Sequence, residues 1–414
     1  MRCLYGCQIV QDDEKDWQVQ SAQMADIYAN STITLAASAS PGPHGGLFQD
    51  ADPKCIGRPI SDINAIHMRR SLWHSFQSLP LLQRGWVFQE RVLSPRIIHF
   101  AEQELIWECM EHKDCTCGEM ATDPLKGRQV WLVSKNLCHP TRWRLLKHDH
   151  VNITNAWLDI VRDYSQLVLS RPTDVFPAIS GITKSFRDAT GWEYVAGMWK
   201  ETITQSLSWY ACYPGIRHKP WRAPTFSWAS IRFNGSSSMG VSHHHWREVD
   251  TSATVIEVKC PPKGADPTGQ LESGYIILSG TVIQAAVEPG DNYMRGEIVY
   301  DLWTLPSPGR TANRFEFWVD FDFQQAGHGA GACETVFILE LLREKGHDKI
   351  WVAYLVLLKR KSEYWECNGT VGDCEFERIG LLMVQSDKAK PHPGTFEEAS
   401  PEQAIQHNAV VKII

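Results

Sequence analysis

The sequence predicts an α/β fold, followed by a helical segment and a β-rich C-terminal region. Between Asp12 and Glu108, helical and strand patterns alternate, which is typical of a partly parallel sheet covered by helices. Between residues 120 and 190, apolar residues recur at helical spacing. From about residue 251 onward, β-branched and apolar runs are separated by turn residues. These observations divide the chain into residues 1–120, 121–232 and 251–414.

The first region is expected to alternate between helices and strands. Acidic residues at its start suit the first turn of a helix, because carboxylates complement the positive end of the helix dipole. Ser31–Ala37 is rich in β-branched and small apolar residues, which suits a buried strand. A second helix begins near Leu81 and ends at Pro95, since proline does not continue a helix. Two short strands follow, at Arg96–Phe100 and Glu104–Glu108.

The later regions also have helix and strand patterns. Asn155–Leu169 and Trp192–Trp209 are expected to be helices with apolar faces, and Asn234–Ser238 is the expected linker. The predicted C-terminal strands are Ala253–Val258, Tyr275–Val287, Arg314–Phe321, Thr335–Leu342, Lys349–Leu358 and Arg378–Val384.

The composition argues against several classes of protein. The 414 residues carry 48 acidic and 41 basic side chains, a formal net charge of -7, so binding to nucleic acid or to anionic membranes is not indicated. No apolar run approaches the roughly 20 residues that span a bilayer. The 12 cysteines are scattered and follow no secretion signal, which favours a cytoplasmic protein with reduced thiols. The motifs of phosphate-binding loops, dinucleotide folds, α/β-hydrolases and zincins are absent.

The segment from Arg84 to Phe100 is the most informative part of the chain. Trp86 and Glu90 stand four residues apart, so they lie on one side of the predicted helix. A large aromatic ring beside a carboxylate can shield it from water and change its pKa. Trp86 and Glu90 are therefore candidate site residues, because the ring can change the acidity of the carboxylate.

The same segment resembles the RGWxxQERxLSPRxxHF signature of fungal heterokaryon incompatibility (HET) domains. Upstream, Gln11–Trp17 and Met24–Tyr28 resemble the QDDxxDW and MxxIY motifs of these domains, and the resemblance extends to about residue 232. The residues that carry the signature motifs are Asp12, Asp13, Asp16, Trp17, Arg84, Gly85, Trp86, Gln89, Glu90, Arg91, Ser94 and Pro95.

The family pattern usually starts with a further strand and helix, and the position of its LWID acidic residue falls near Tyr5. The resemblance therefore implies that residues 1–120 are the C-terminal portion of the domain, without its N-terminal strand and helix. Residues 121–232 would be the helical extension of HET proteins. HET domains look like relatives of TIR domains, so an incomplete TIR-like, flavodoxin-like fold is expected.

The resemblance implies a role in non-self recognition after cell fusion that ends in programmed cell death. In the favoured mechanism, the domain is an interaction module that binds a protein partner or self-associates, with no cofactor. In the other, it is an enzyme that cleaves NAD, with Glu90 stabilising the ribosyl cation and Trp86 forming a pocket wall. Against this, Glu90 would only hold the fold if it pairs with Arg84, Arg91 or Arg96. An inactive, truncated family member is a third interpretation.

Two clusters contain residue types that bind metals. The first, a weak candidate for a zinc site, comprises Cys109, His112, Cys115 and Cys117. Their spacing is not that of paired CxxC knuckles, so a loop of free thiols is favoured. The second, His243-His244-His245, has no partner motif, and consecutive residues of an extended chain point to opposite sides. The sequence therefore favours no metal site at either place.

Overall fold

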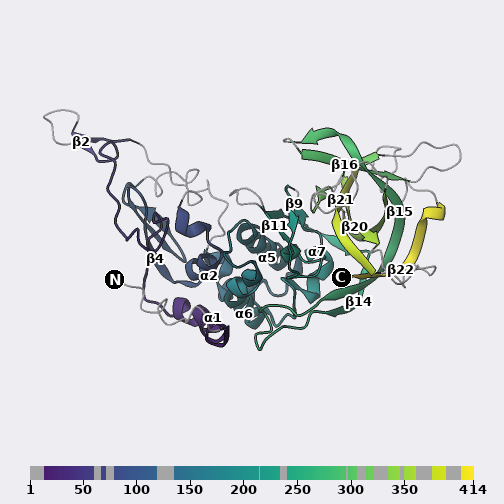
Figure 1. The fold of residues 1–414 in the computed structure, drawn as a ribbon, viewed down its shortest axis with the longest axis horizontal. Coiled ribbons are helices and arrows are strands. Elements are labelled where there is room, and N and C mark those ends of the chain that lie inside the picture. Colours follow the sequence, from purple (N-terminus) through teal and green to yellow (C-terminus); the bar gives the residue numbers. More distant parts are fainter. Residues whose placement is uncertain are drawn as a thin grey trace. The chain divides into compact units, whose positions relative to one another are not determined.

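The computed structural model describes residues 14–59, 67–70, 79–118, 135–213, 215–233, 240–294, 297–304, 314–316, 318–320, 334–345, 349–359, 375–387 and 402–414. The chain forms two compact units (Figure 1). The first unit contains residues 1–145 and 167–190, and the second contains residues 146–166 and 191–414. The mixed α/β content and the β-rich C-terminal region agree with the sequence prediction. The helices predicted between residues 121 and 232, however, are distributed over both units.

The sheet of the first unit has four strands in the order β1-β4-β5-β6. These are β1 (Thr34–Ala36), β4 (Arg96–Phe100), β5 (Leu105–Cys109) and β6 (Lys113–Cys115). The predicted parallel pairing is found between β1 and β4, and the other pairs are antiparallel. Alternate residues of β4 and β5 are buried, so one face of the sheet lies in the core and the other is partly open.

The helices of the first unit cover the buried face of this sheet. Val87 of α2 (Gly85–Leu93) packs in one apolar cluster with Ile106 of β5. Helices α1 (Glu14–Ala29) and α6 (Ser180–Thr190) pack with α2. The remaining short elements of this unit include β2 (Arg58–Pro59), β3 (His67–Met68), η2 (Pro80–Gln83), η3 (Lys135–Cys138), η4 (Pro172–Val175) and η5 (Pro177–Ile179); α4 (Pro140–Leu146) reaches the unit boundary.

Helix α2 has clear start and stop signals. Arg84, the residue before the helix, has extended backbone angles of φ -87° and ψ 130°. At the other end, the backbone N–H and the hydroxyl of Ser94 both donate to the carbonyl oxygen of Glu90, at 3.3 and 2.6 Å. Pro95 follows and prevents the helix from continuing.

The second unit begins with α5 (His150–Ser165), which the sequence placed at Asn155–Leu169. Its start is fixed by Asp149, whose carboxylate accepts a hydrogen bond from the backbone N–H of Asn152 at 3.1 Å. One face of α5 is apolar, as predicted, and includes the fully buried Trp157 and Ile160.

The predicted helix Trp192–Trp209 is wrong over most of its length. Strands β7 (Tyr194–Val195) and β8 (Met198–Trp199) form a hairpin there, and only the short η6 (Lys200–Thr202) and α7 (Ile203–Ser206) are helical. The two turn residues have positive φ, 45° at Ala196 and 88° at Gly197. Two positive φ values are the requirement of the tight hairpin turns that match strand twist. Ala196 and Gly197 form the turn. The prediction missed this turn because the apolar residues around it recur at helical spacing.

The C-terminal part of the second unit is a ten-stranded sheet. Its strands are β13 (Val249–Thr251), β14 (Thr254–Lys259), β15 (Tyr275–Met294), β16 (Glu297–Thr304), β17 (Arg314–Glu316), β18 (Trp318–Val319), β19 (Glu334–Lys345), β20 (Lys349–Lys359), β21 (Glu375–Asp387) and β22 (Ile405–Ile413). All six predicted strand regions contain strands, whereas β13, β16 and β22 were not predicted. Smaller pairs join β9 (Tyr210–Ala211) to β12 (Val241–Ser242) and β10 (Ile216–Arg217) to β11 (Ile231–Arg232). The unit also contains the short helices η7 (Trp228–Ser230) and η9 (Glu402–Ala404).

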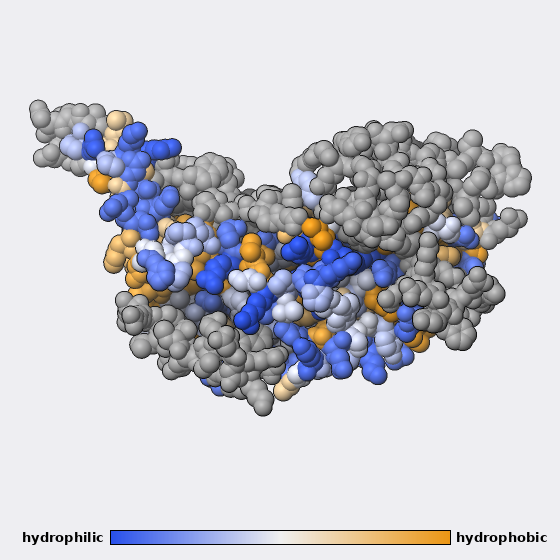
Figure 2. Space-filling view, viewed as in Figure 1, coloured by the Kyte–Doolittle hydropathy of each residue, from blue (hydrophilic) through white to orange (hydrophobic). Residues whose placement is uncertain are grey.

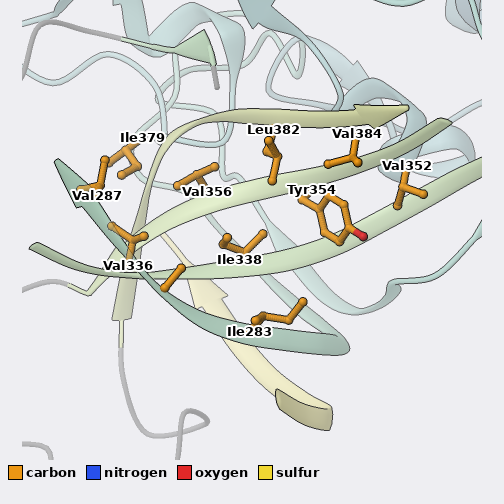
Figure 3. Close-up of a cluster of buried hydrophobic side chains, with 11 residues drawn as sticks. Ile283, Val287, Val336, Ile338, Val352, Tyr354, Val356, Ile379, Leu382 and Val384 are labelled. Carbon is orange, nitrogen blue, oxygen red and sulfur yellow. The ribbon is translucent and has the colours of Figure 1, made fainter. Parts of the chain in front are cut away.

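Five of these strands close into a ring, because β15 pairs with both β19 and β22. Strands β20 and β21 complete the ring between β19 and β22. Apolar side chains from β15, β19, β20 and β21 point toward one another inside it, among them Ile283, Ile338 and Val356 (Figure 3). Closure removes unpaired strand edges and gives the second unit its own core.

The described surface is mostly hydrophilic in one view, with hydrophobic residues interspersed (Figure 2). None of the described helices has the length and apolar character needed to cross a membrane. The predicted linker Asn234–Ser238, together with Asp12 and Asp13, lies outside the described residues.

Candidate functional site

The signature residues of α2 contact several different elements of the first unit. Gly85 donates its backbone N–H to the carbonyl of Val168 at 2.8 Å, and a Cβ at Gly85 would lie 2.5 Å from a methyl group of Leu169. The side-chain oxygen of Gln89 accepts a hydrogen bond from the N–H of Gly181 at the start of α6, at 3.2 Å. Residue 85 must therefore be small, and Gln89 ties α2 to α6.

Arg91 is the centre of a buried ionic network. Its Nε and one terminal nitrogen donate to the two carboxylate oxygens of Glu108, at 2.8 and 2.6 Å. Lys113 lies 3.1 Å from the same carboxylate, and His99 Nε2 lies 3.2 Å from it. Burial raises the pKa of Glu108, but Arg91, Lys113 and the hydrogen bond with His99 outweigh burial and hold this pKa well below its usual range. Glu108 is therefore a permanently charged anchor that joins α2 to the sheet.

A serine completes a nucleophile–base–carboxylate arrangement in this network. The hydroxyl of Ser38 lies 2.9 Å from Nδ1 of His99, whose other nitrogen faces Glu108. This is the order of groups in hydrolytic triads. All three side chains are fully buried, however, so a substrate cannot reach the hydroxyl. The arrangement satisfies buried polar groups and holds the sheet to the loop after β1.

Lys135 extends the network from the other side of α2. Its ammonium group donates to the backbone carbonyl of Ser94, and the Ser94 hydroxyl lies 2.9 Å from the hydroxyl of Thr34 on β1. Burial lowers the pKa of Lys135 to about 8, with Glu108 acting against this shift. Ser94, one of the signature residues, therefore links α2 to β1 and to Lys135.

Glu90 and Trp86, the predicted site residues, have different hydrogen-bond partners. Glu90 is half-buried, and its carboxylate accepts a hydrogen bond from the Tyr28 hydroxyl at 2.8 Å. The indole N–H of Trp86 donates to Asp174 at 3.0 Å. Burial raises the pKa of Glu90, while Tyr28 and the charge of Arg84 oppose this rise. Glu90 is thus a shielded carboxylate at the junction of α1 and α2.

Of the three arginines considered as partners of Glu90, only Arg84 acts on it electrostatically. Arg91 is committed to Glu108, and Arg96 is exposed at the start of β4. Asp16 and Trp17 lie on α1, and Pro95 is half-buried between α2 and β4.

The four residues of the cysteine-rich loop do not form one cluster. The thiols of Cys115 and Cys117 lie 3.0 Å apart, and Glu104 completes a group of potential ligands with them. Cys109 and His112 lie outside this group, and Cys109 Sγ accepts a hydrogen bond from the backbone N–H of His112 at 3.3 Å. The pair Cys109 and His112 is thus separated from the pair Cys115 and Cys117 by the β5–β6 hairpin. The spacing of the four residues in the sequence did not indicate this separation.

The open face of the sheet carries a row of apolar side chains. Leu35 on β1, Ile98 on β4 and Trp107 on β5 are adjacent in register, so their side chains lie on the same face. Leu105 and Phe100 lie beside them on the same face. Leu35 is 44% exposed and Leu105 40% exposed, whereas the other three are partly buried. We call these five residues the open sheet face.

The comparison with known families concerns this same part of the chain. Residues 7–90 match the model of the heterokaryon incompatibility protein (HET) family. This segment is part of a HET domain. The match ends at Glu90, so Arg91, Ser94 and Pro95 belong to the HET signature by resemblance. No curated protein and no solved structure matches the chain.

Sequence reasoning missed the residues that complete the HET signature in space. Tyr28 binds Glu90, Asp174 binds Trp86, and Glu108 binds Arg91. The alternation of strand residues could have indicated that His99 and Glu108 are buried beside the HET signature residues, since both occupy inward positions of predicted strands. No local pattern could have paired Asp174 with Trp86, because 88 residues separate them.

Proposed function

We propose that the first unit acts as an interaction module in non-self recognition that leads to programmed cell death, and that it self-associates through the open sheet face. The observation that carries this proposal is the apolar row of Leu35, Ile98 and Trp107 on a sheet whose opposite face is buried along β4 and β5. Apolar groups that remain in contact with water on a folded sheet favour association with another surface.

The position of β1 supports a second copy of the chain as the partner. Among the described strands, β1 lies at the end of the four-stranded sheet, and Ile33 and Leu35 are both more than 40% exposed there. An end strand presents backbone groups that can pair with another strand. Pairing of β1 with β1 of a second copy around a two-fold axis would place both open sheet faces on one continuous surface.

The roles of the signature residues agree with an interaction module. Gly85, Gln89, Arg91 and Ser94 all make contacts that hold α2 to other elements. The HET signature therefore serves to position the sheet. The proposed activity needs a stable surface and no reacting group, and it would operate in the cytoplasm, without nucleic acid.

A cell-death assay tests this proposal. Overexpression of the chain should kill the host cell, and Leu35→Lys should abolish killing at equal protein level, because a charge in the apolar row opposes association. Ile256→Lys is the matched control, since Ile256 is similarly exposed, at 56%, on β14 of the second unit. Killing by Leu35→Lys at the wild-type rate would overturn the proposal.

The NAD-cleaving alternative, in a TIR-like, flavodoxin-like unit, rests on Glu90. Its half-buried carboxylate, raised pKa and hydrogen bond with Tyr28 suit a group that stabilises a ribosyl cation. Release of nicotinamide by purified protein, lost in Glu90→Gln, would favour this alternative. Killing that survives Glu90→Gln at a normal protein level would exclude it and leave self-association as the mechanism.

A further inference from the structure

Two histidines and an aspartate converge in the second unit. His243 and His245, which follow β12, stack with ring centroids 4.7 Å apart and an interplanar angle of 18°. Asp159 of α5 places Oδ1 3.5 Å from Nε2 of His243 and 3.2 Å from Nε2 of His245. One ligand atom from each of the three residues lies within 4.8 Å of the other two.

The sequence favoured no joint metal site at the three consecutive histidines, and the structure adds a carboxylate to two of them. Neighbours along the extended segment do point to opposite sides, and His244 accordingly faces Glu344 at 3.2 Å. Residues two apart share a side, however, so His243 and His245 form a pair. The third group, Asp159, lies on α5, more than 80 residues earlier in the chain.

The segment that carries the histidines is fixed along α5 on both sides of the cluster. The N–H of Val241 donates to the hydroxyl of Ser165 at 3.0 Å, and the side chain of Asn155 donates to the carbonyl of Trp246 at 2.9 Å. Ten helical residues span about 15 Å, and five extended residues span about 16 Å. The two segments therefore run together, which holds Asp159 opposite the histidines.

We propose that Asp159, His243 and His245 bind a divalent transition-metal ion of the zinc class. Zinc binds imidazole nitrogen and carboxylate oxygen at about 2.0–2.2 Å with tetrahedral geometry, which places two ligand atoms about 3.3 Å apart. The observed separations of 3.5 and 3.2 Å fit this value. Two imidazoles and one carboxylate are also a frequent donor set for zinc and iron.

The buried nitrogen of His243 is an independent indication of a ligand. The side chain of His243 is only 2% exposed, and its Nε2 has Asp159 Oδ1 at 3.5 Å, a distance at the long limit for a hydrogen bond. A buried polar atom of this kind normally has a partner. Burial lowers the pKa of His243, against the effect of Asp159.

The surrounding charges favour a cation. Arg162 donates to Asp159 at 2.6 Å and to Asp163 at 3.1 Å, so two carboxylates face one guanidinium and leave one net negative charge. Burial raises the pKa of Asp159, but the hydrogen bond with His243 and the charge of Arg162 outweigh burial and hold this pKa below its usual value. Arg162 also fixes the orientation of the carboxylate, a role that groups around metal ligands commonly have.

Three protein ligands leave a coordination position open. Structural zinc sites usually have four protein ligands, whereas sites with three keep a position for water or for a bound molecule. His245 is 56% exposed, so the open position would face solvent and accept water or a small anion.

Zinc titration of the chelator-stripped, full-length protein tests the proposal. His245→Ala and Asp159→Asn should each weaken one zinc equivalent at least about 100-fold, since changes even around the ligands cost 10- to 100-fold. His244→Ala is the matched control, because His244 lies in the same tripeptide but faces Glu344, and it should bind like the wild type. Circular dichroism in chelator confirms that the variants are folded.

A second set of variants separates this site from the Glu104, Cys115 and Cys117 cluster. In Cys115→Ser/Cys117→Ser protein the zinc equivalent should remain, and cobalt(II) bound to it should show no thiolate absorption band. Loss of the equivalent in this variant, or wild-type binding by both His245→Ala and Asp159→Asn, would overturn the proposal. Folded wild-type protein that binds no zinc would also overturn it.

Discussion

Each unit buries an arginine–carboxylate pair, but the two pairs have different surroundings. In the first unit, Glu108 faces three basic groups, Arg91, Lys113 and His99, and its pKa lies well below the usual range. In the second unit, Asp320 lies 2.8 Å from the fully buried Arg378. Burial raises the pKa of Asp320 despite this contact, and also lowers the pKa of Arg378.

Arg378 also holds the backbone of the second unit together. Its guanidinium donates to the carbonyl oxygens of Leu207 and Trp209 and lies 3.5 Å from the centroid of the Trp209 ring. These contacts join β21 to a segment about 170 residues earlier in the chain. Glu108 shares its charge with two cations, Arg91 and Lys113, and has a hydrogen bond with His99, whereas Asp320 relies mainly on one arginine that also satisfies two buried carbonyls.

The largest effect should follow Arg378→Met. This change leaves Asp320 and the two carbonyls without their shared donor, and loss of one partner of a buried ion pair costs about 3–5 kcal/mol. Urea denaturation measures the free energy of unfolding. The double variant Arg378→Met/Asp320→Leu should recover part of the loss, because it removes the orphaned charge. A loss below about 1 kcal/mol would show that Arg378 does not hold the second unit together.

Arg91→Met should cost less, about 2–3 kcal/mol. Lys113 at 3.1 Å and His99 at 3.2 Å continue to face Glu108 in this variant. The same urea denaturation experiment compares the two arginines directly. If Arg91→Met destabilises the protein more than Arg378→Met, Lys113 and His99 do not compensate for the loss of Arg91, and the contrast between the two pairs fails.

Lys135 gives the first network a distinctive pH dependence. Its folded pKa of about 8 lies below the unfolded value of about 10.4. Between these pH values the unfolded chain binds more protons, so stability should rise with pH, by about 2 kcal/mol from pH 8 to pH 10. The measurement is the difference in unfolding free energy between wild type and Lys135→Met at each pH. A flat difference would show that the ammonium group of Lys135 is not perturbed by burial.

Leu35→Lys should have the smallest effect on stability, within about 0.5 kcal/mol, because Leu35 is 44% exposed and the methylene groups of a lysine can cover the same apolar surface. Thermal unfolding of wild type and variant checks this expectation. A larger loss would mean that Leu35 supports the fold, and it would then be unsuitable for testing association.

The contrast between the two networks also explains what could be predicted from the sequence. Arg91 lies in a recognisable motif, and its partner Glu108 lies 17 residues away on a predicted strand, so the first network has a local signal. Arg378 and Asp320 stand 58 residues apart and belong to no motif. The strands of the second unit were predicted from their β-branched runs, but the closure of the ring depends on pairings such as β15 with β22, which no local pattern specifies.

The candidate sites also combine residues that a local pattern indicates with residues that only the fold brings near. Glu90 was found because Trp86 and the HET signature surround it in the sequence, but its contact with Tyr28 depends on how α1 packs on α2. The pair His243 and His245 follows from strand alternation alone, whereas Asp159 could be added only with knowledge of the fold.

Sedimentation velocity of the purified protein over a range of concentrations tests the central claim most directly. We predict that wild type, Glu90→Gln and Ile256→Lys form dimers or larger assemblies as concentration rises, and that Leu35→Lys remains monomeric. Such a result would assign association to the open sheet face and show that it does not need the charge of Glu90. Wild-type association by folded Leu35→Lys, or a wild-type protein that stays monomeric at every concentration, would contradict the account.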